Sequence, residues 1–588
     1  MVSLTELQEI PSKNMVLLMG PPGSGKSTFC EQVILQNLAF DKPIIYVTTE
    51  YDPSKAEASL KEKGLSRIEP GLLNFVDAYN ETVGVSVPDR LDTVHADCND
   101  LSSIDIGISR LSEQVGQRNI LLVFDSLTSP YLFNGKDILR FMTQTLTRFA
   151  ARGNSVLACM DEGCGNEEDL GSMMSLSNGL LKMEVKEERS ILHVLKHPKV
   201  ERTIIEISTE KIWKERALNV KLWDSEKVGR SIEALRSGSL TGEMGQFAVN
   251  LFWLNFMQWS GMLWDPKRFP IMIYEIWKQY GIITSELLSS LPWHTKLLLK
   301  LYFRLPQNLS EPKDVKKFFK FFRRLFGEKG RRDFIMEYLD DVSKTDEYQI
   351  RVYENVECWG FKNIGTTIAS MFPPAIAGGI QGFDREKRNW NAIETKCIGL
   401  GDPYCEWKVV PGEIDGLQDS LEKDISVLER IHDRLMNQLM GFLLDEHPLI
   451  ETRPRLGNDY FMGMGNLAVI AGGDRYLMAL RMGAAKAGKE VGENLIAAGV
   501  GEDESIKRLL RFLEHCKVGK VTIDKTIRIK ENIESVWTKA FTTEKWEEPI
   551  CYFTTGFLNG FFLSVKNQHV IETKCIAMGD PYCEWEFR

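Results

Sequence analysis

A glycine-rich segment that follows an apolar strand places the strongest constraint on this chain. Residues 20–28 read GPPGSGKST, with the spacing Gly-x4-Gly-Lys-Ser, and the run MVLLM precedes them. Backbone N–H groups of such a loop surround phosphate oxygens, and the N-terminus of the next helix adds partial positive charge. Lys26 is expected at the β- and γ-phosphates and Ser27 at a magnesium ion. The segment predicts a nucleoside triphosphate site, with ATP and Mg²⁺ as the expected pair. Its predicted binding residues are Gly20, Pro21, Pro22, Gly23, Ser24, Gly25, Lys26, Ser27 and Thr28.

Short apolar runs in residues 1–212 predict an α/β sheet around this loop. Stretches with helical periodicity lie between the runs, and continuous apolar runs are typical of parallel strands that are buried on both faces. Two further runs, 190–195 and 203–207, predict an antiparallel hairpin that closes the domain. The runs expected to form the parallel sheet are 15–19, 43–47, 120–124 and 155–159.

Two acidic residues at predicted strand ends extend the phosphate site. Asp125 follows the run ILLVF, and a carboxylate at the end of a strand beside such a loop holds magnesium, usually through water. Glu50 ends the run IIYVTTE, twenty-four residues after Lys26. Hydrolysis needs a group that orients the attacking water and partly deprotonates it, and Glu50 is the candidate. The alternative for Glu50 is an acid that caps a helix or faces solvent.

With these motifs in this order, residues 1–212 resemble the RecA-type ATPases, and most closely their KaiC-like branch. The resemblance implies a RecA-like P-loop domain that hydrolyses ATP in a homo-oligomer, with Glu50 activating water. Many members carry a second glutamate at the next position, where this chain has Tyr51. The family completes its site with basic residues of a neighbouring protomer, which map onto Lys196 and, less closely, Lys199. The segment lacks the usual Lys-x-Arg, so ordinary surface lysines are the alternative.

A close sequence repeat organises the rest of the chain. Residues 393–407 read IETKCIGLGDPYCEW and residues 571–585 read IETKCIAMGDPYCEW, at an offset of 178. The same offset aligns Gly378 with Gly556. Two copies of one domain are therefore expected. The predicted division is an ATPase domain at 1–212, a linker at 213–239, a first copy at 240–411 and a second copy at 440–588.

A heptad pattern lies between the two copies. Apolar residues recur at every seventh position, and Asp424 interrupts the second apolar position once. Such a pattern is typical of a coiled-coil-like helix, and a helical connector is predicted at 412–439. A helix packed on its own domain is the alternative, and dimerisation through the helix stays open. The recurring residues are Ile414, Leu421, Leu428, Leu435 and Phe442.

Each copy carries two cysteines around the turn Gly-Asp-Pro-Tyr. A turn places two thiols side by side, but zinc takes about four ligands. In the second copy Cys551 offers a third thiol, and Glu572 or His569 offers a fourth ligand. The first copy has Pro373 where the second has Cys551, and its spare thiol, Cys358, lies at an unrelated offset, so the copies are not expected to be equivalent. Buried thiols in a reducing cell are the alternative. The cysteine pairs are Cys397 with Cys405 and Cys575 with Cys583.

The C-terminal half resembles the 4-vinyl-reductase-type domain, a small-molecule sensor. The resemblance rests on the repeated end E-T-x-C-x3-G-D-P-Y-C-E-W and on the upstream spacing C-x4-G-x3-G of the second copy. It implies α+β domains, often dimeric, with an apolar cavity for a hydrophobic or aromatic ligand. It also implies zinc held by cysteines and an acidic residue, which favours glutamate over His569. The implied zinc ligands are Cys551, Glu572, Cys575 and Cys583 in the second copy and Glu394, Cys397 and Cys405 in the first.

Aromatic residues concentrate in residues 247–303 and suit the wall of such a cavity, although a plain core is the more common reason for such stripes. The most apolar run, 247–264, is interrupted by polar residues, so a buried helix is expected in preference to a membrane span. The aromatic residues are Phe247, Phe252, Trp253, Phe256, Trp259, Trp264, Trp277 and Trp293.

The overall charge and the N-terminal residues narrow the function classes. The formal net charge is −10, which disfavours nucleic acid and anionic lipid as partners. No apolar signal segment precedes the predicted loop, which indicates the cytosol, where the eleven cysteines stay reduced.

Together these patterns predict an α/β RecA-like P-loop domain followed by two α+β sensor domains joined by a helical coiled-coil-like connector. The expected function is an ATP-binding and ATP-hydrolysing signal-transduction protein. Its repeated domains would sense a small hydrophobic ligand and regulate the ATPase or a partner protein. The alternative is a non-catalytic switch that responds only to ATP occupancy and carries structural zinc domains.

Overall fold

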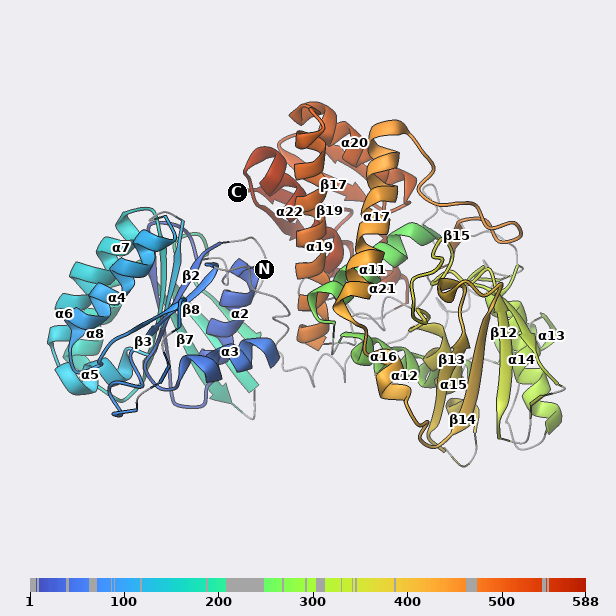
Figure 1. The fold of residues 1–588 in the computed structure, drawn as a ribbon, viewed down its shortest axis with the longest axis horizontal. Helices are drawn as coiled ribbons and strands as arrows, with labels where there is room; N and C mark the ends of the chain where they lie inside the picture. The colour runs from blue at the N-terminus through green and yellow to red at the C-terminus, as the bar shows by residue number, and fades with distance from the viewer. Residues whose placement is uncertain are drawn as a thin grey trace. The chain divides into compact units, whose positions relative to one another are not determined.

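The computed structural model divides the chain into two compact units, Met1–Thr209 and Glu210–Arg588 (Figure 1). The predicted linker, 213–239, and Phe247 lie outside the described residues. The described residues are 7, 10–38, 42–62, 71–85, 87–88, 90–116, 119–186, 189–207, 248–266, 269–290, 293–302, 312–328, 330–340, 342–343, 346–384, 386, 388–461, 473–541, 546 and 549–588.

The first unit contains a nine-stranded sheet in the order β4-β3-β2-β5-β6-β1-β7-β8-β9. The strands from β4 to β7 pair in parallel, and β8 and β9 add antiparallel to one edge. The four predicted apolar runs are β1, β2, β5 and β6, and the predicted hairpin is β8–β9. The strands are β1 (Asn14–Gly20), β2 (Ile44–Thr48), β3 (Leu73–Asp77), β4 (Thr93–His95), β5 (Leu121–Asp125), β6 (Ser155–Asp161), β7 (Gly179–Lys186), β8 (Arg189–Lys196) and β9 (Thr203–Ile207).

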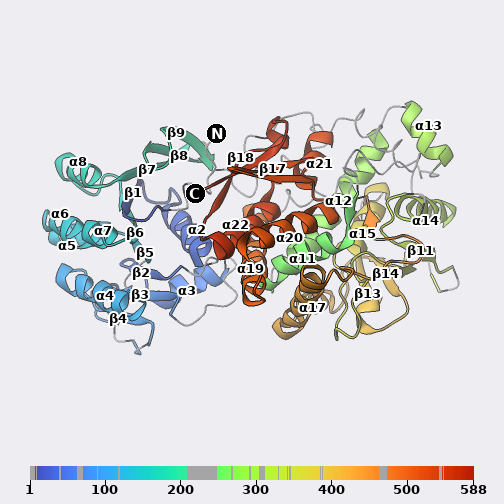
Figure 2. The same cartoon turned by 90° about the horizontal axis from the view of Figure 1, so that it is seen from above.

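Helices cover both faces of this sheet. Figures 1 and 2 show α2 and α3 on one face and α4 to α8 on the other. Burial on both faces explains why β2, β3 and β5 consist of buried residues only. The helices are α2 (Lys26–Leu38), α3 (Pro53–Glu62), α4 (Leu101–Gln114), α5 (Thr128–Asn134), α6 (Asp137–Phe141), the π-helical η1 (Met142–Thr147), α7 (Arg148–Ala151) and α8 (Glu167–Leu176).

The second unit contains two four-stranded antiparallel sheets with the same strand order. One runs β11-β12-β14-β13 and the other β16-β17-β19-β18. Each has a bulge at the same place, between Glu394 and Lys396 in β13 and between Glu572 and Lys574 in β18. The sequence repeat is therefore also a repeat of topology. The strands are β11 (Ile335–Tyr338), β12 (Tyr348–Tyr353), β13 (Trp390–Lys396), β14 (Cys405–Pro411), β16 (Lys520–Ile523), β17 (Thr526–Lys530), β18 (Val570–Lys574) and β19 (Cys583–Phe587).

A closely crossed helix pair accompanies each sheet, α12 with α15 and α19 with α22. The glycines that the repeat aligns lie at these crossings. A Cβ on Gly378 would lie 1.9 Å from the carbonyl oxygen of Lys278, and one on Gly556 would lie 2.2 Å from that of Arg481. The helices are α11 (Leu251–Trp264), α12 (Phe269–Ser290), α13 (Trp293–Tyr302), α14 (Pro312–Phe326), α15 (Phe372–Phe383), η3 (Ile398–Leu400), α16 (Leu417–Leu421), α17 (Ile425–Asp445), α19 (Gly473–Ala497), α20 (Glu502–His515), α21 (Ile533–Phe541), α22 (Tyr552–Lys566) and η4 (Ile576–Met578).

Helix α11 lies between the two repeats. The ring of Trp253 packs edge-on against Phe553 of the second repeat, with centroids 5.0 Å apart, while Asn255 Nδ2 donates to the carbonyl of Val356 in the first. Just before α11, the short strand β10 (Val249–Asn250) pairs with β15 (Asp459–Tyr460). The most apolar run is thus the buried helix that the sequence predicts. Within the described part of the chain, no helix has the length and apolarity needed to cross a membrane.

The predicted helical connector at 412–439 is wrong as one continuous helix. The segment forms the short α16, which buries no residue, and then α17, which begins at Ile425. Asp424 caps α17, because its carboxylate accepts the N–H of Ser426 at 2.8 Å. An aspartate favours this position over a helix interior. Leu428 and Leu435 then pack in the core of the unit, so the alternative, a helix packed on its own domain, describes α17.

Candidate nucleotide site and metal centres

The glycine-rich loop connects β1 to α2 at the carboxyl edge of the parallel sheet. Gly23 and Gly25 have φ of 78° and 97°, a backbone region that favours glycine. A Cβ on Gly20 would lie 2.7 Å from the carbonyl oxygen of Met183, so β1 approaches β7 without room for a side chain. The predicted strand–loop–helix arrangement is present, and α2 begins at Lys26.

Lys26 is folded into this loop and is nearly buried. Its Nζ donates to the carbonyl oxygens of Gly20 at 3.0 Å and Pro21 at 2.9 Å. Nζ also forms an ion pair with Asp161 Oδ1 at 2.7 Å. Asp161 is the last residue of β6, which pairs with β1, and it is not among the predicted site residues. The rule that selects Asp125, an acid at the end of a strand beside the glycine-rich loop, also selects Asp161.

Asp125 ends β5, and the structure brings it to Ser27. The Ser27 hydroxyl lies 3.5 Å from Oδ1 of Asp125, while Oδ2 accepts hydrogen bonds from Tyr51 at 2.5 Å and Tyr46 at 3.0 Å. Burial raises the pKa of the Asp125 carboxyl, and the hydrogen bonds from the two tyrosines and Ser27 oppose that rise. Hydroxyl and carboxylate oxygens are the ligands Mg²⁺ prefers, so these residues fit a magnesium site.

Glu50 follows β2 by two residues and is exposed at the same edge of the sheet. Partial burial of its carboxylate and the negative charges of Asp125 and Asp161 raise its pKa, while Lys26 lowers it. The structure therefore places Glu50 within the electrostatic field of the loop lysine and both strand-end acids. Its role in activating water stays a prediction.

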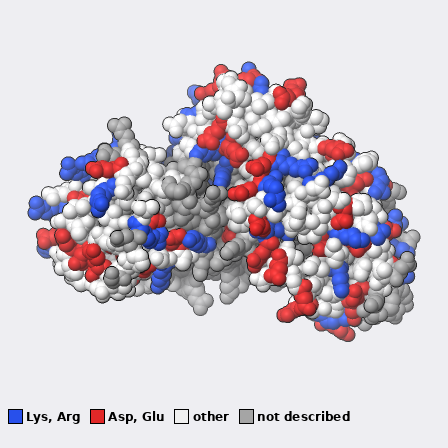
Figure 3. All heavy atoms as spheres, viewed as in Figure 1, with Lys and Arg blue, Asp and Glu red and all other residues white. Residues whose placement is uncertain are grey.

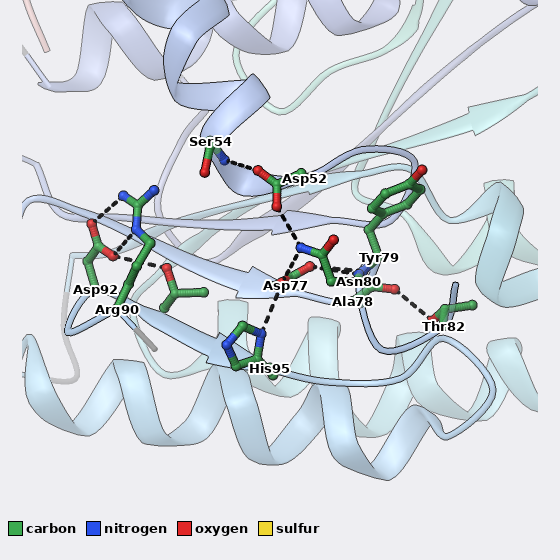
Figure 4. Close-up of polar contacts among 11 residues, drawn as sticks. Asp52, Ser54, Asp77, Ala78, Tyr79, Asn80, Thr82, Arg90, Asp92 and His95 are labelled. Carbon is green, nitrogen blue, oxygen red and sulfur yellow. Dashed lines mark hydrogen bonds and ion pairs between the residues drawn. The ribbon is translucent and has the colours of Figure 1, made fainter. Parts of the chain in front are cut away.

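A polar network fixes the segment that follows Glu50 (Figure 4). Asn80 Nδ2 lies 2.7 Å from Asp52 Oδ2 and 2.7 Å from Asp77 Oδ2. Asp77 is buried at the end of β3 and also contacts Nδ1 of His95 at 3.0 Å. These side chains tie the turn after β2 to the ends of β3 and β4. These residues carry no recognisable sequence signal, because each is a single polar residue in a short strand or in a turn beside one.

Lys196 does not reach the loop of its own chain. It ends β8, which runs antiparallel to β7, and its Nζ donates to the carbonyl oxygen of Ser177 at 2.8 Å. In register Lys196 lies opposite Leu180, near the start of β7. Lys199 lies beyond it and is exposed. Action on the nucleotide of a neighbouring protomer stays a prediction for both lysines.

The second repeat gathers three thiols and one carboxylate into a buried cluster. Cys551 Sγ lies 3.9 Å from Cys575 Sγ and 3.6 Å from Cys583 Sγ. Zn–S bonds of about 2.3 Å in a tetrahedron would separate the sulfurs by about 3.8 Å. Glu572 supplies the fourth ligand atom, whereas the ring of His569 contacts Asn559. The set fits zinc. Of the two candidates for the fourth ligand, Glu572 lies in the cluster and His569 does not.

The first repeat gathers an equivalent set, which corrects the prediction that the copies differ in ligands. Cys358, Glu394, Cys397 and Cys405 each present a ligand atom, and all four atoms lie within 4.8 Å of one another. Cys358 Sγ lies 3.7 Å from Cys397 Sγ. Cys358 lies just after β12, whereas Cys551 lies at the start of α22. A fixed sequence offset cannot reveal the match, because the two thiols reach the same point from different elements.

Burial raises the pKa of Cys358, Cys551, Glu394 and Glu572 well above their ordinary values. Neighbouring cysteine thiols, which would carry the same charge, also raise the pKa of each of these groups. Ionised thiolates and carboxylate in such a place need a compensating cation. A divalent metal ion would bind each cluster as its groups release their protons.

The aromatic residues of α11 form core. Trp253 and Phe256 pack edge-on against Phe553 and Phe557, with centroids 5.0–6.1 Å apart. Trp293, by contrast, is 77 % exposed. These packed rings favour the core interpretation over a cavity wall. A separate, open groove of about 690 Å³ beside α17 is lined mainly by charged and amide residues, unlike the expected apolar cavity. Its lining residues include Lys362, Arg430, Asp433, Arg434, Gln438 and His447.

Charged side chains of both signs share the face of the molecule drawn in Figure 3. Basic groups lie next to acidic groups on the visible surface of each unit, and the formal net charge of the chain is −10. A nucleic-acid surface usually gathers basic residues on one face. The exclusion of nucleic acid as a partner stays a prediction.

Comparisons with known proteins match two separate parts of the chain. Residues 4–222 match the model of the KaiC ATPase family, and residues 533–588 match that of the 4-vinyl-reductase domain. UPF0273 proteins of Pyrococcus furiosus and Pyrococcus horikoshii are 35% and 32% identical over 127 residues, which are 21% of this chain and 50% of each relative. The chain thus spans about half the length of these curated relatives.

Among solved structures, a KaiC-like protein of Pyrococcus horikoshii OT3 is 17% identical, with a TM-score of 0.26, over 34% of this chain and 85% of the other. The mostly parallel sheet of the first unit fits a RecA-like fold. The chain carries a KaiC-like ATPase domain in its N-terminal part and a 4-vinyl-reductase domain at its C-terminus.

Proposed function

We propose that the chain is an ATP-hydrolysing signal-transduction protein whose C-terminal repeats sense a small hydrophobic ligand and regulate the ATPase or a partner protein. The observation that carries the ATPase is the meeting of Lys26, Ser27 and Asp125 at one sheet edge, with Glu50 beside them. The KaiC family match supports the hydrolytic role, and the 4-vinyl-reductase match supports the sensing role. In this proposal the protein acts in the cytosol.

The residues divide the work of phosphoryl transfer. Ser27 and Asp125 would hold Mg²⁺, which neutralises charge on the phosphates. Lys26 would exchange its bonds with Asp161 and the loop carbonyls for the β- and γ-phosphate oxygens. Glu50 would orient a water molecule and accept its proton. The pKa of Glu50 is raised, and a general base works best when its pKa lies near the working pH. Lys196 would act on the nucleotide of the next protomer in a homo-oligomer.

The two cysteine clusters would hold Zn²⁺. Four protein ligands close the coordination sphere, which is typical of a structural zinc site. In each repeat the cluster joins the last two strands to a preceding segment, so zinc would stiffen the end of each repeat. The ligand-binding role of the repeats rests on the 4-vinyl-reductase match and on the resemblance of the first repeat to the second.

The proposal is tested by phosphate release from purified protein with ATP and Mg²⁺. We expect slow turnover in the wild type, retained ATP binding without turnover in Glu50→Gln, and loss of ATP binding in Lys26→Ala. Glu81→Gln, which changes an exposed acid of the same domain, is the matched control and should behave as wild type. Wild-type turnover in Glu50→Gln would remove Glu50 from the mechanism, and ATP binding by Lys26→Ala would refute the nucleotide site.

A non-catalytic ATP switch is the second candidate. Tyr51 occupies the position beside Glu50 and contacts Asp125, and the segment around Lys196 lacks an arginine at the expected place. Tight ATP binding with no phosphate release from the wild type would select this switch. The sensing role is tested by measuring the ATP hydrolysis rate with and without ligands that bind the repeats. A rate that does not change with any bound ligand would contradict regulation of the ATPase.

A further inference from the structure

The two oxygens of the Asp125 carboxylate have different surroundings. Oδ1 lies toward the Ser27 hydroxyl at 3.5 Å, while Oδ2 accepts from both Tyr51 and Tyr46. The two phenol oxygens lie 2.6 Å from each other. One oxygen of this carboxylate therefore points toward the magnesium ligand of the loop, and the other is held by two phenols.

Neighbouring structure fixes both phenols. Tyr46 belongs to β2, opposite Val123 of β5, and its ring is fully buried beside Phe75, with centroids 6.0 Å apart. Tyr51 follows Glu50 directly, and the ammonium group of Lys55 lies 6.0 Å from the centre of its ring. The hydroxyl of Tyr46 thus reaches Asp125 from the adjacent strand, and that of Tyr51 reaches it from the segment that carries Glu50.

An aspartate carboxylate rotates readily about its last bond, because that torsion has broad and roughly equivalent minima. The short bond from Tyr51 to Oδ2, with the Tyr46 hydroxyl against both oxygens of that bond, restrains this rotation and leaves Oδ1 directed at Ser27. We infer that Tyr51 is a positioning residue of the magnesium site, which acts by holding Oδ2 of Asp125 so that Oδ1 faces the metal beside Ser27. This inference rests on the proposed function, and it goes further by linking the magnesium carboxylate to the segment of the candidate base.

The consequence is a physical link between two parts of the reaction. The metal side of the site is ordered through Asp125, and Tyr51 adjoins Glu50 in the chain. Loss of the Tyr51 hydroxyl would therefore loosen Asp125 while the residues of the glycine-rich loop stay unchanged. The sensitive quantity is the dependence of ATP affinity on Mg²⁺, because phosphate contacts made by the loop itself stay in place.

The experiment measures ATP affinity of the full chain by calorimetry, first in EDTA and then across a Mg²⁺ titration. For Tyr51→Phe we expect the EDTA affinity within about twofold of wild type, and the Mg²⁺ concentration for half of the affinity gain raised about tenfold, the size associated with a hydrogen bond to a charged group. Tyr46→Phe should shift it less, because Tyr51 makes the shorter contact, and the double variant should shift it most.

Tyr131→Phe is the matched control. Tyr131 donates to the Asp169 carboxylate at 2.9 Å in the same unit, so the variant removes the same kind of bond elsewhere and should leave the Mg²⁺ dependence unchanged. An unshifted Mg²⁺ dependence in folded Tyr51→Phe and in the double variant, with Asp125→Asn strongly impaired, would overturn the inference and leave the proposed function intact. Absence of ATP binding in the wild type would overturn both.

Discussion

The two repeats of the second unit build the same cluster with one ligand exchanged between elements. In the first repeat the third thiol is Cys358, after β12, and Pro373 stands at the start of α15. In the second repeat the third thiol is Cys551, at the start of α22, and Ser535 follows β17. The hydroxyl of Ser535 still lies 3.1 Å from Cys583 Sγ, so it points into the cluster that Cys358 enters in the other copy. The third thiol therefore occupies the same place in both clusters, but it comes from the segment after the second strand in one repeat and from the start of a helix in the other.

The repeats also differ beside this point in what they bury. Val356 N donates to the carbonyl oxygen of Asp333 at 3.0 Å. In the second repeat Ile533 N donates to that of Val518 at 2.8 Å, so Asp333 and Val518 are counterparts. Asp333 is fully buried, with Oδ2 2.8 Å from Nε of Arg331, whereas Val518 is apolar. One backbone frame therefore accommodates either a buried ion pair or hydrocarbon.

The largest effect is expected from removing either third thiol. With zinc in both clusters, the purified chain should contain about two equivalents by elemental mass spectrometry, and Cys358→Ser and Cys551→Ser about one each. The cluster is then left with two thiols and one carboxylate, and the loss of a thiolate ligand weakens zinc binding most. Cys516→Ser, which removes a buried thiol outside both clusters, should keep two equivalents. Unchanged metal in Cys358→Ser would show that the first repeat does not use this thiol.

Moving the thiol should then restore the lost equivalent. Cys551→Ala combined with Ser535→Cys gives the second repeat the arrangement of the first, and we expect its zinc to return because Ser535 already lies against Cys583. Cys551→Ala with Ser535→Ala is the control and should stay at about one equivalent. Failure of the relocated thiol to recover metal would mean that the two positions are not interchangeable.

Replacing the carboxylate should have a smaller effect. Glu394→Gln and Glu572→Gln each leave three thiols, so the stoichiometry at excess zinc should hold while affinity falls on the order of 10–100-fold. Competition with a zinc chelator measures the change. Glu584→Gln, in a residue that pairs with Lys574 and lies outside the cluster, is the control. An affinity unaffected by either substitution would point to three-thiol binding with a ligand from elsewhere.

The smallest effect concerns the buried ion pair of the first repeat. Burial raises the pKa of Asp333 to about 6, against the lowering by Arg331 and Arg453. A raised pKa means that its contribution to stability is full below about pH 4 and is lost as pH rises through about 6. The Asp333→Asn variant should therefore be more stable than the wild type at pH 7, and this difference in stability should shrink toward pH 4.

Thermal unfolding across that pH range measures this difference. Asp415→Asn, in an exposed acid, should show no such trend and serves as the control. A variant of Asp333 that is less stable than wild type at pH 7, and that recovers toward pH 4, would show that the pair with Arg331 outweighs the cost of burial.

The sequence predicted those parts of the molecule that local patterns encode. The parallel strands are continuous apolar runs, and the loop around Lys26 has a fixed spacing, so both could be located from residue types alone. Asp125 was found because strand ends of a parallel sheet meet at one edge. The half-buried strand β4, in contrast, has three residues and forms no continuous apolar run, so residue types alone do not predict it.

The remaining features depend on contacts between distant segments. The heptad after Pro411 could not show that Asp424 would cap a helix, because an aspartate at that spacing also fits an imperfect coiled coil. The offset of 178 between the repeats does not align Cys358 with Cys551, so the sequence does not predict Cys358 as a ligand. In the structure the turn after β12 places Cys358 beside Cys397. Tyr51 could be recognised as a departure from the family pattern, but its bond to Asp125 arises only when β2 and β5 pair.

The position of α11 has a consequence for how the chain is made. Trp253 packs against the ring of Phe553, which follows it in the chain by 300 residues. A ribosome adds about 5–20 residues per second, so on the order of 15–60 s separate the synthesis of Trp253 from that of Phe553. The side of α11 that Trp253 presents to Phe553 therefore stays uncovered during translation until α22 has been synthesised.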